Sequence, residues 1–125
     1  QLIAERKEIT SCYREYLADV PGITMFYPDR EPGVGYNYAY LPILIDAEKF
    51  GKSRDAVYES LKKENIYTRR YFYPIVPDFG CYRAEHGNDV LPVARRAGKE
   101  VLCLPIYNGL ARADVEQICT WIRGW

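Results

Sequence analysis

Residues 36–45 read YNYAYLPILI, and the alternation within this stretch decides the fold that the sequence predicts. Successive side chains of a β-strand point to opposite faces of a sheet. The stretch therefore predicts a strand with an aliphatic face, which helices can cover, and a tyrosine face, which they leave open. The aliphatic side chains are Leu41, Ile43 and Ile45, and the tyrosines are Tyr36, Tyr38 and Tyr40.

Further strands and helices are predicted on both sides of this strand. Residues 23–27 read as its partner across a loop rich in proline and glycine. Two more runs of strand-forming residues follow, and runs with apolar residues at helical spacing lie between the strands. The predicted fold is α+β: a small, mainly antiparallel four-stranded sheet with helices on one face. The remaining strands are predicted at 66–72 and 101–104, and the helices at 2–18, 54–64, 91–99 and 114–123.

Length and charge limit the classes of protein to consider. A chain of 125 residues is expected to form one domain, spanning 1–125. Its 17 basic residues balance 17 acidic ones, so it lacks the positive field that nucleic acid or an anionic membrane would attract. No apolar run approaches the roughly 20 residues that span a bilayer. We therefore expect a cytoplasmic protein with neither nucleic acid nor membrane as a partner.

The start of the chain bears on domain organisation. It lacks the basic-then-apolar order of a signal peptide, and it opens inside a helical pattern without a methionine. We expect that another segment precedes it in the natural protein.

Cysteine and histidine give no pattern typical of a reactive or metal-binding site. The four cysteines show no C-x-x-C spacing, and Cys12, Cys103 and Cys119 lie in apolar helix or strand patterns, which predicts small core residues. The single histidine, His86, sits in a polar loop. We expect no metal site and no catalytic residue in this chain.

Residues 68–83, TRRYFYPIVPDFGCYR, concentrate cations and aromatic rings in one loop region. Arginine pairs with phosphate or carboxylate, and aromatic rings stack on flat or apolar ring faces, so the region suits an anionic or sugar-like ligand. The alternative is an exposed arginine pair beside core aromatics. The candidate ligand-lining residues are Arg70, Tyr71, Tyr73 and Tyr82.

The tyrosine face of the strand allows two interpretations. Tyrosine forms strands readily and can sit half-exposed on an open sheet. It is also enriched where one end of the side chain is buried and the other meets water, as at interfaces. With 12 tyrosines in the chain, we expect another domain or subunit to cover Tyr36, Tyr38 and Tyr40.

Several blocks in the same order resemble the DegT/DnrJ/EryC1/StrS family of aminotransferases. The most specific is RRYFYP at 69–74 with the YR pair at 82–83, and the resemblance covers nearly the whole chain. One departure is that many relatives carry a histidine soon after the Tyr-Pro pair, where this chain has Ile75, Val76 and Pro77. The other blocks are IAERKEITSCYREYLADVPGI, NYAYLPILID, LPVARRAGKEVLCLPIYNGL and DVEQI.

The resemblance implies the C-terminal small domain of a dimeric fold-type-I enzyme that uses pyridoxal phosphate. Such enzymes move an amino group, usually from glutamate, onto a keto group of a nucleotide-linked sugar in polysaccharide or antibiotic-sugar pathways. The cofactor-binding residues lie in a large N-terminal domain, so this chain is expected to hold no cofactor and to be inactive alone. The resemblance also implies that the sugar side of the active-site cleft is lined by Arg70, Tyr71, Tyr73 and Tyr82. The alternative is a stand-alone binding module with the same fold.

Overall fold

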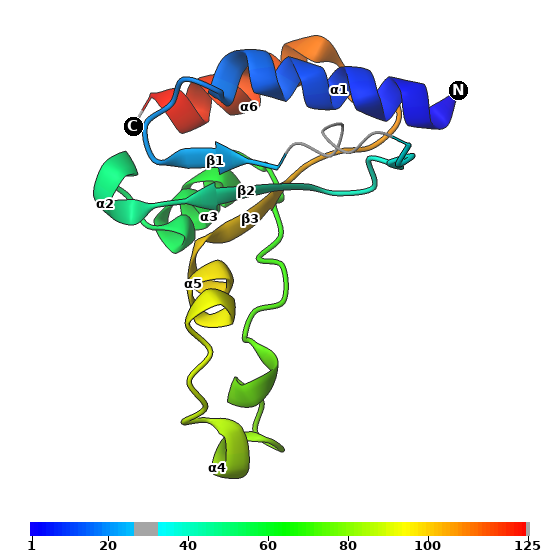
Figure 1. Cartoon of the computed structure of the whole chain (residues 1–125). Helices are drawn as coiled ribbons and strands as arrows, with labels where there is room; N and C mark the ends of the chain where they lie inside the picture. The colour runs from blue at the N-terminus through cyan, green and yellow to red at the C-terminus, as the bar shows by residue number, and fades with distance from the viewer. Residues whose placement is uncertain (27–32, 125) are drawn as a thin grey trace.

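A computed structural model describes residues 1–26 and 33–124 (Figure 1). Within these ranges no helix is long and apolar enough to cross a membrane. Tyr27 and much of the predicted hairpin loop lie outside the described residues. The elements are α1 Leu2–Leu17, β1 Ile23–Met25, β2 Leu41–Ile45, α2 Ala47–Phe50, α3 Arg54–Lys63, η2 Val76–Asp78, α4 Arg83–His86, α5 Pro92–Glu100, β3 Val101–Leu104 and α6 Arg112–Arg123.

The sheet among the described residues has three strands in the order β1-β2-β3, all antiparallel. The prediction of four strands was therefore wrong in number. The run predicted as a strand at 66–72 makes only one isolated bridge, between Arg69 and Cys103. Phe72, at the end of that run, has a φ of 50°, which lies in the left-handed region and not in the extended conformation of a strand.

Helices α1 and α6 lie side by side on one face of the sheet and run in the same direction (Figure 1). Near the start of α1, Glu5 accepts a hydrogen bond from the Gly109 amide at 2.7 Å. Near its end, Asp19 pairs with Arg123 at 3.0 Å. The aliphatic side chains of β2 are buried in the same core as the inner faces of these helices, which confirms the predicted aliphatic face. The core includes Ile9, Tyr13, Leu17, Leu41, Ile43, Ile45, Val115, Ile118 and Ile122.

The turn between α1 and β1 needs a glycine. Gly22 has a φ of +80°, and a Cβ at this position would lie 2.5 Å from the backbone nitrogen of Phe50. Only a residue without a side chain allows the chain to turn here against α2. Helix α2 itself is capped by Asp46, whose side chain accepts from the amides of Glu48 and Lys49.

The three predicted interface tyrosines do not share one strand face. β2 begins only at Leu41, after all three. Tyr38 has a φ of 52° and is 3% exposed, so this chain itself covers it. Tyr36 packs edge-on against Tyr38, with ring centroids 5.1 Å apart, whereas Tyr40 is exposed. The left-handed conformation of Tyr38 breaks the period-2 alternation on which the expectation of a common face rested.

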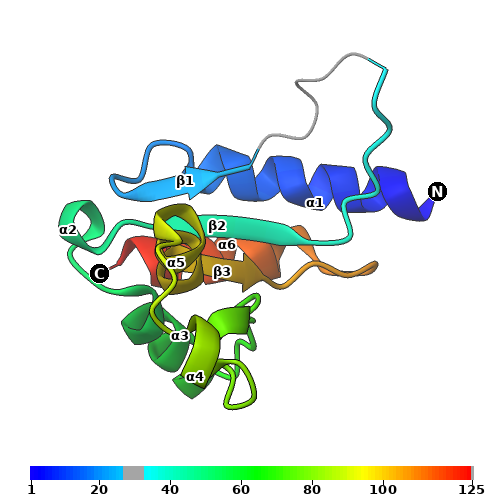
Figure 2. The same cartoon turned by 60° about the horizontal axis from the view of Figure 1, so that its bottom comes forward.

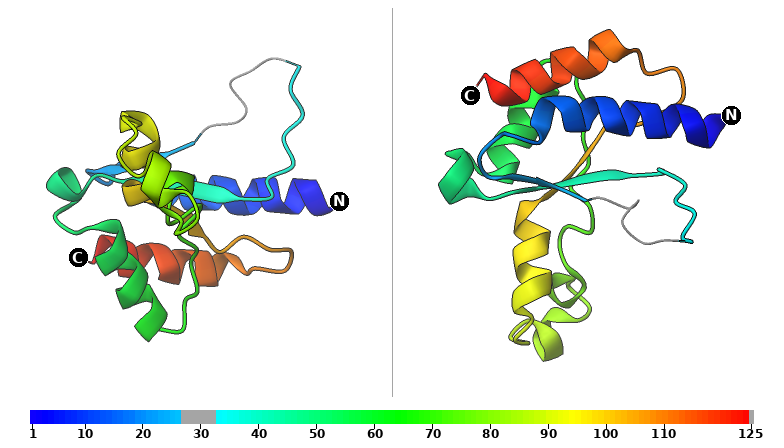
Figure 3. Two further views of the ribbon diagram at one scale, coloured as in Figure 1. Left: turned by 90° about the horizontal axis from the view of Figure 1, so that it is seen from below. Right: turned by 45° about the horizontal axis from the view of Figure 1, so that its top comes forward.

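An arm of the chain, residues 73–100, extends away from the sheet on the side opposite α1 and α6 (Figures 1 and 3). It contains η2, α4 and α5, and Figure 2 shows α5 in front of β2 and β3. Helices therefore lie on both sides of the sheet, which corrects the prediction of one covered face. Within the arm, Arg95 of α5 donates hydrogen bonds to the Asp78 carboxylate at the end of η2 and to the Gly87 and Asp89 carbonyls, which follow α4.

Three of the four cysteines are buried, as predicted. Cys12, Cys103 and Cys119 lie in the interior, and Cys81 is exposed on the arm. Burial raises the pKa of Cys103 to about 11 and that of Cys119 to about 12. Because the thiolate is the nucleophilic form, these buried thiols are poorly reactive at neutral pH.

Candidate functional site

The site is built on the first turn of α3. The hydroxyl of Ser53 caps this helix by accepting from the Ala56 amide at 3.2 Å. The next residue, Arg54, is only 1% exposed. Its guanidinium donates to the carbonyls of Gly98 at 3.0 Å and Val101 at 2.8 Å. These carbonyls lie where α5 ends and β3 begins, and helix-terminal carbonyls need such external donors. Arg54 thus joins α3 to the base of the arm.

Arg70 and Tyr73, two of the predicted site residues, lie together beside Arg54. Asp55 accepts from Arg54 at 2.8 Å and from Arg70 at 3.3 Å. The Arg70 guanidinium carbon lies 4.6 Å from the centre of the Tyr58 ring and 5.1 Å from that of Tyr73, and Arg54 lies 4.8 Å from Tyr73. All three distances place a cation over a ring face. We call Arg54, Asp55, Tyr58, Arg70 and Tyr73 the Arg70 cluster.

The Arg70 cluster borders an open, polar cavity of about 760 Å³ between α2, the start of α3 and α5. Arg54, Asp55 and Tyr73 form part of its lining. The other charged groups of the lining are of both signs, and Arg96 among them pairs with Glu100 at 2.9 Å, which raises the pKa of Arg96. The cavity is large enough for part of a sugar nucleotide and offers donors for its anionic groups. Its remaining charged residues are Asp46, Glu48, Lys49 and Lys99.

The other two predicted site residues lie elsewhere. The ring of Tyr71 packs against Tyr40, with centroids 5.1 Å apart, and against Phe72 at 4.2 Å. Burial raises the pKa of the Tyr71 hydroxyl. Tyr82 is exposed and directly precedes α4, the helix that Figure 1 shows far along the arm from the sheet. The structure thus brings together Arg70 and Tyr73, but not all four residues.

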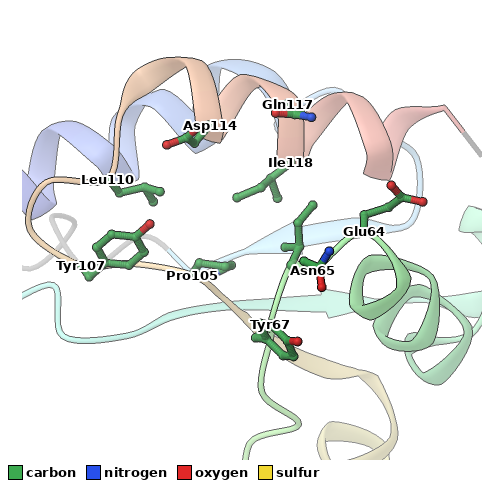
Figure 4. A pocket seen from close by; sticks show the side chains of 10 residues that line it. Glu64, Asn65, Tyr67, Pro105, Tyr107, Leu110, Asp114, Gln117 and Ile118 are labelled. Atoms are coloured by element: carbon green, nitrogen blue, oxygen red, sulfur yellow. The ribbon is translucent and has the colours of Figure 1, made fainter.

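A second hollow, of about 340 Å³, lies between α6 and residues 64–67 (Figure 4). Glu64 and Asp114 supply its charge, and neither arginine nor lysine lines it. An anionic ligand would meet like charge there without a compensating cation. This hollow is therefore a poorer candidate for a nucleotide-linked substrate than the cavity beside Arg70.

Sequence reasoning missed Arg54, Asp55 and Tyr58 because they lie within an ordinary amphipathic helix. A signal was present: Arg54, Val57 and Leu61 have the i, i+3, i+7 spacing of one helix face, and all three are buried. An arginine in the inward series must find carbonyl or carboxylate partners, because a buried charge without them is very costly.

Comparison with known proteins places the chain in a family. The DegT/DnrJ/EryC1/StrS aminotransferase family matches residues 1–123. This chain belongs to that family. The resemblance predicted from the sequence is thereby confirmed, and the comparisons lend no support to the stand-alone module.

Individual relatives of the family agree in both sequence and fold. The chain is 44% identical to the dTDP-4-amino-4,6-dideoxy-D-glucose transaminase of Escherichia coli over 98% of its own length and 33% of that protein. It matches the crystal structure of DesI in the presence of its TDP-sugar product with a TM-score of 0.89 and 32% identity, over 98% of this chain and 30% of that one. The aminotransferase TlmJ from Streptoalloteichus hindustanus gives a TM-score of 0.82 at 29% identity, over 98% and 31%. The chain thus spans about one third of the length of these relatives.

Proposed function

We propose that this chain is the small domain of a pyridoxal-phosphate-dependent aminotransferase that aminates a nucleotide-linked keto-sugar. In this proposal it lines one side of the active-site cleft, and the rest of the protein holds the cofactor. The single observation that carries the proposal is the Arg70 cluster, in which a cation is held between two tyrosine rings beside a polar cavity. The printed activity of the Escherichia coli relative supports the substrate class.

The role of the Arg70 cluster is to bind and orient the substrate. The Asp55 contact and the Tyr58 and Tyr73 rings restrict the rotamers of Arg70, so little side-chain entropy remains to be lost on binding. A guanidinium held in this way pairs with a phosphate oxygen, and the exposed Tyr73 ring offers a face to an apolar ring surface. Binding energy used for orientation contributes to rate as well as to affinity.

The residues present do not fit an anchor for pyridoxal phosphate. When bound, this cofactor supplies the carrier for the amino group, and its anchor is a lysine in a desolvated or otherwise activated setting. Lys7, Lys49, Lys52, Lys62, Lys63 and Lys99 are all exposed. We therefore assign the cofactor to the two thirds of the relatives' length that this chain does not span. As the family resemblance implies, we expect the complete protein to be a cytoplasmic homodimer.

The test is Arg70→Ala in the complete protein. We expect kcat/KM for the nucleotide-linked keto-sugar to fall roughly 5- to 150-fold, because orientation and a charged contact are lost. This factor corresponds to a loss of about 1–3 kcal/mol of transition-state stabilisation. The absorbance of the bound cofactor stays unchanged, because Arg70 has no part in holding it.

The matched control is Arg69→Ala, which removes the same side chain one position earlier. Arg69 is exposed and makes its bridge to Cys103 through backbone atoms, so its kcat/KM is expected to stay within about twofold of the unmodified protein. Equal kcat/KM values for the Arg70→Ala and unmodified proteins would assign Arg70 to the surface and remove the basis of the proposal.

A further inference from the structure

A further groove, chemically different from the two hollows described above, lies on the arm. Its volume is about 650 Å³, and it runs between α5, the segment 71–77 and the side of the sheet that α1 and α6 leave open. Its lining is aliphatic and aromatic, without a charged side chain. The larger lining residues are Leu44, Tyr71, Ile75, Val76, Leu91 and Val101.

The groove exposes large apolar side chains to solvent in this chain. Phe72 is 73% exposed and Val76 is 61% exposed, and both line it. Single exposed apolar residues are common on protein surfaces, whereas a contiguous apolar patch with a hollow marks an interaction site. The aromatic row of Tyr40, Tyr71 and Phe72 continues this surface toward the sheet.

The walls of the groove are firmly built. Arg54 fastens the base of α5 to α3, and Arg95 fastens α5 to Asp78, Gly87 and Asp89 of the arm. Gly98 lets α5 approach the 71–77 segment closely, since a Cβ there would lie 2.5 Å from Cγ2 of Ile75. The hollow is thus preformed, and an occupant need not pay for ordering it.

We propose that this groove receives an apolar segment of the remainder of the same polypeptide, and that it forms the main seam between the small domain and the rest of the protein. The inference rests on the proposed function. The relatives are about three times as long as this chain and match it over nearly its whole length, so a covalently linked remainder is available to cover the arm. A tethered segment has an effective concentration in the millimolar range, which saturates even a modest apolar groove. The uncharged lining is unsuited to an anionic sugar nucleotide and suited to aliphatic and aromatic side chains.

The surface differs from the one that the sequence indicated. Tyr38 is already covered by its own chain, so it cannot serve as a contact. Tyr40 remains available and packs on Tyr71, which lines the groove. The interface that we propose therefore lies on the arm and includes only the edge of the predicted tyrosine face.

The experiment uses Val76→Cys in the complete protein, with Cys81→Ser to remove the exposed native thiol of the arm. Val76 lies in the groove and is not part of the Arg70 cluster. The reference is Val34→Cys in the same background, because Val34 is 55% exposed in this chain and lies outside the groove. We expect a maleimide to react at least tenfold more slowly with the thiol of the Val76→Cys variant than with that of the reference. Equal rates would show an uncovered groove and overturn the proposal.

A photoreactive maleimide on the same thiol then identifies the occupant. We expect a crosslink at the mass of one chain, mapped by mass spectrometry to a peptide outside residues 1–124. A crosslink at twice the mass of one chain, or one confined to residues 1–124, would overturn the proposal. Neither readout depends on activity, so failure here is distinct from failure of the Arg70→Ala test.

Discussion

Arg54 shows how one side chain joins two parts of the molecule. It is a buried cation, and its counterion, Asp55, is half-exposed. The two backbone carbonyls that it satisfies belong to the junction of α5 and β3. Removing a partner from a buried acceptor costs more than forming the hydrogen bond contributes. The stability of the arm therefore depends on a side chain that belongs to another helix.

We expect Arg54→Ala to lower the free energy of unfolding by about 2–5 kcal/mol, because two carbonyls lose their donor and the Tyr73 ring loses a neighbour. Urea denaturation of the chain measures the change. Arg96→Ala is the control: Arg96 is exposed and pairs with Glu100 one turn away, so its loss is expected to cost less than about 1 kcal/mol. Similar losses in the two variants would contradict the role given to Arg54.

At the scale of elements, the close packing of α5 against Ile75, in the segment 71–77, depends on Gly98. Helix propensity alone makes alanine about 1 kcal/mol better than glycine within a helix. Here the added Cβ would meet Cγ2 of Ile75 at 2.5 Å. The two effects have opposite signs, and the steric one is the larger because Ile75 is itself held in the groove wall.

We expect Gly98→Ala to destabilise the chain by about 1–3 kcal/mol, since α5 and Ile75 must move apart. In a double-mutant cycle, Ile75→Ala should relieve most of this loss, because it removes the clashing atom. Gly80→Ala is the control, as a Cβ there has no neighbour within 4 Å. Melting temperatures of the variants report the differences, and a Gly98→Ala chain that melts higher than the unmodified chain would show that propensity dominates.

Periodicity predicted the four longer helices and the buried strands, but not the short helices α2 and α4. The first helix was predicted at 2–18 and lies at Leu2–Leu17, and the strand at 101–104 was predicted in full. Alternation failed to predict the strand limits where single residues leave the usual backbone region. Tyr38 and Phe72 both have positive φ, and neither tyrosine nor phenylalanine indicates such a conformation in the sequence. The candidate site was half predicted, since cation and aromatic content indicated Arg70 and Tyr73, but their partners on α3 depend on tertiary packing.

At the scale of the whole molecule, our proposal assigns the cofactor to a part of the protein outside this chain. The lysines that this chain offers are exposed, whereas the Arg70 cluster and the apolar groove are preformed. In the function that we propose, this chain supplies surfaces to a cleft and to an interface with the rest of the protein, which carries the reactive amine.

We therefore expect the chain alone to form no site-specific adduct with pyridoxal phosphate after borohydride reduction. The lysines of this chain are all exposed, whereas a stable Schiff base with the cofactor needs an amine in a desolvated or otherwise activated setting. Peptide mapping by mass spectrometry makes the test, with the complete protein as reference. There, one lysine outside residues 1–124 should carry the label. A stoichiometric adduct on a single lysine of this chain would show an activated amine that the fold does not explain.

The pairing of α1 with α6 limits how early this chain can fold during translation. The inner face of α1 finds its partner only when α6 has been made, and about 95 residues separate Leu17 from Arg112. At roughly 5–20 residues per second, the apolar side of α1 waits about 5–19 s during translation before that partner emerges. In that interval Ile9, Tyr13 and Leu17 are exposed on the nascent chain. A ribosome-associated chaperone would bind at these apolar residues.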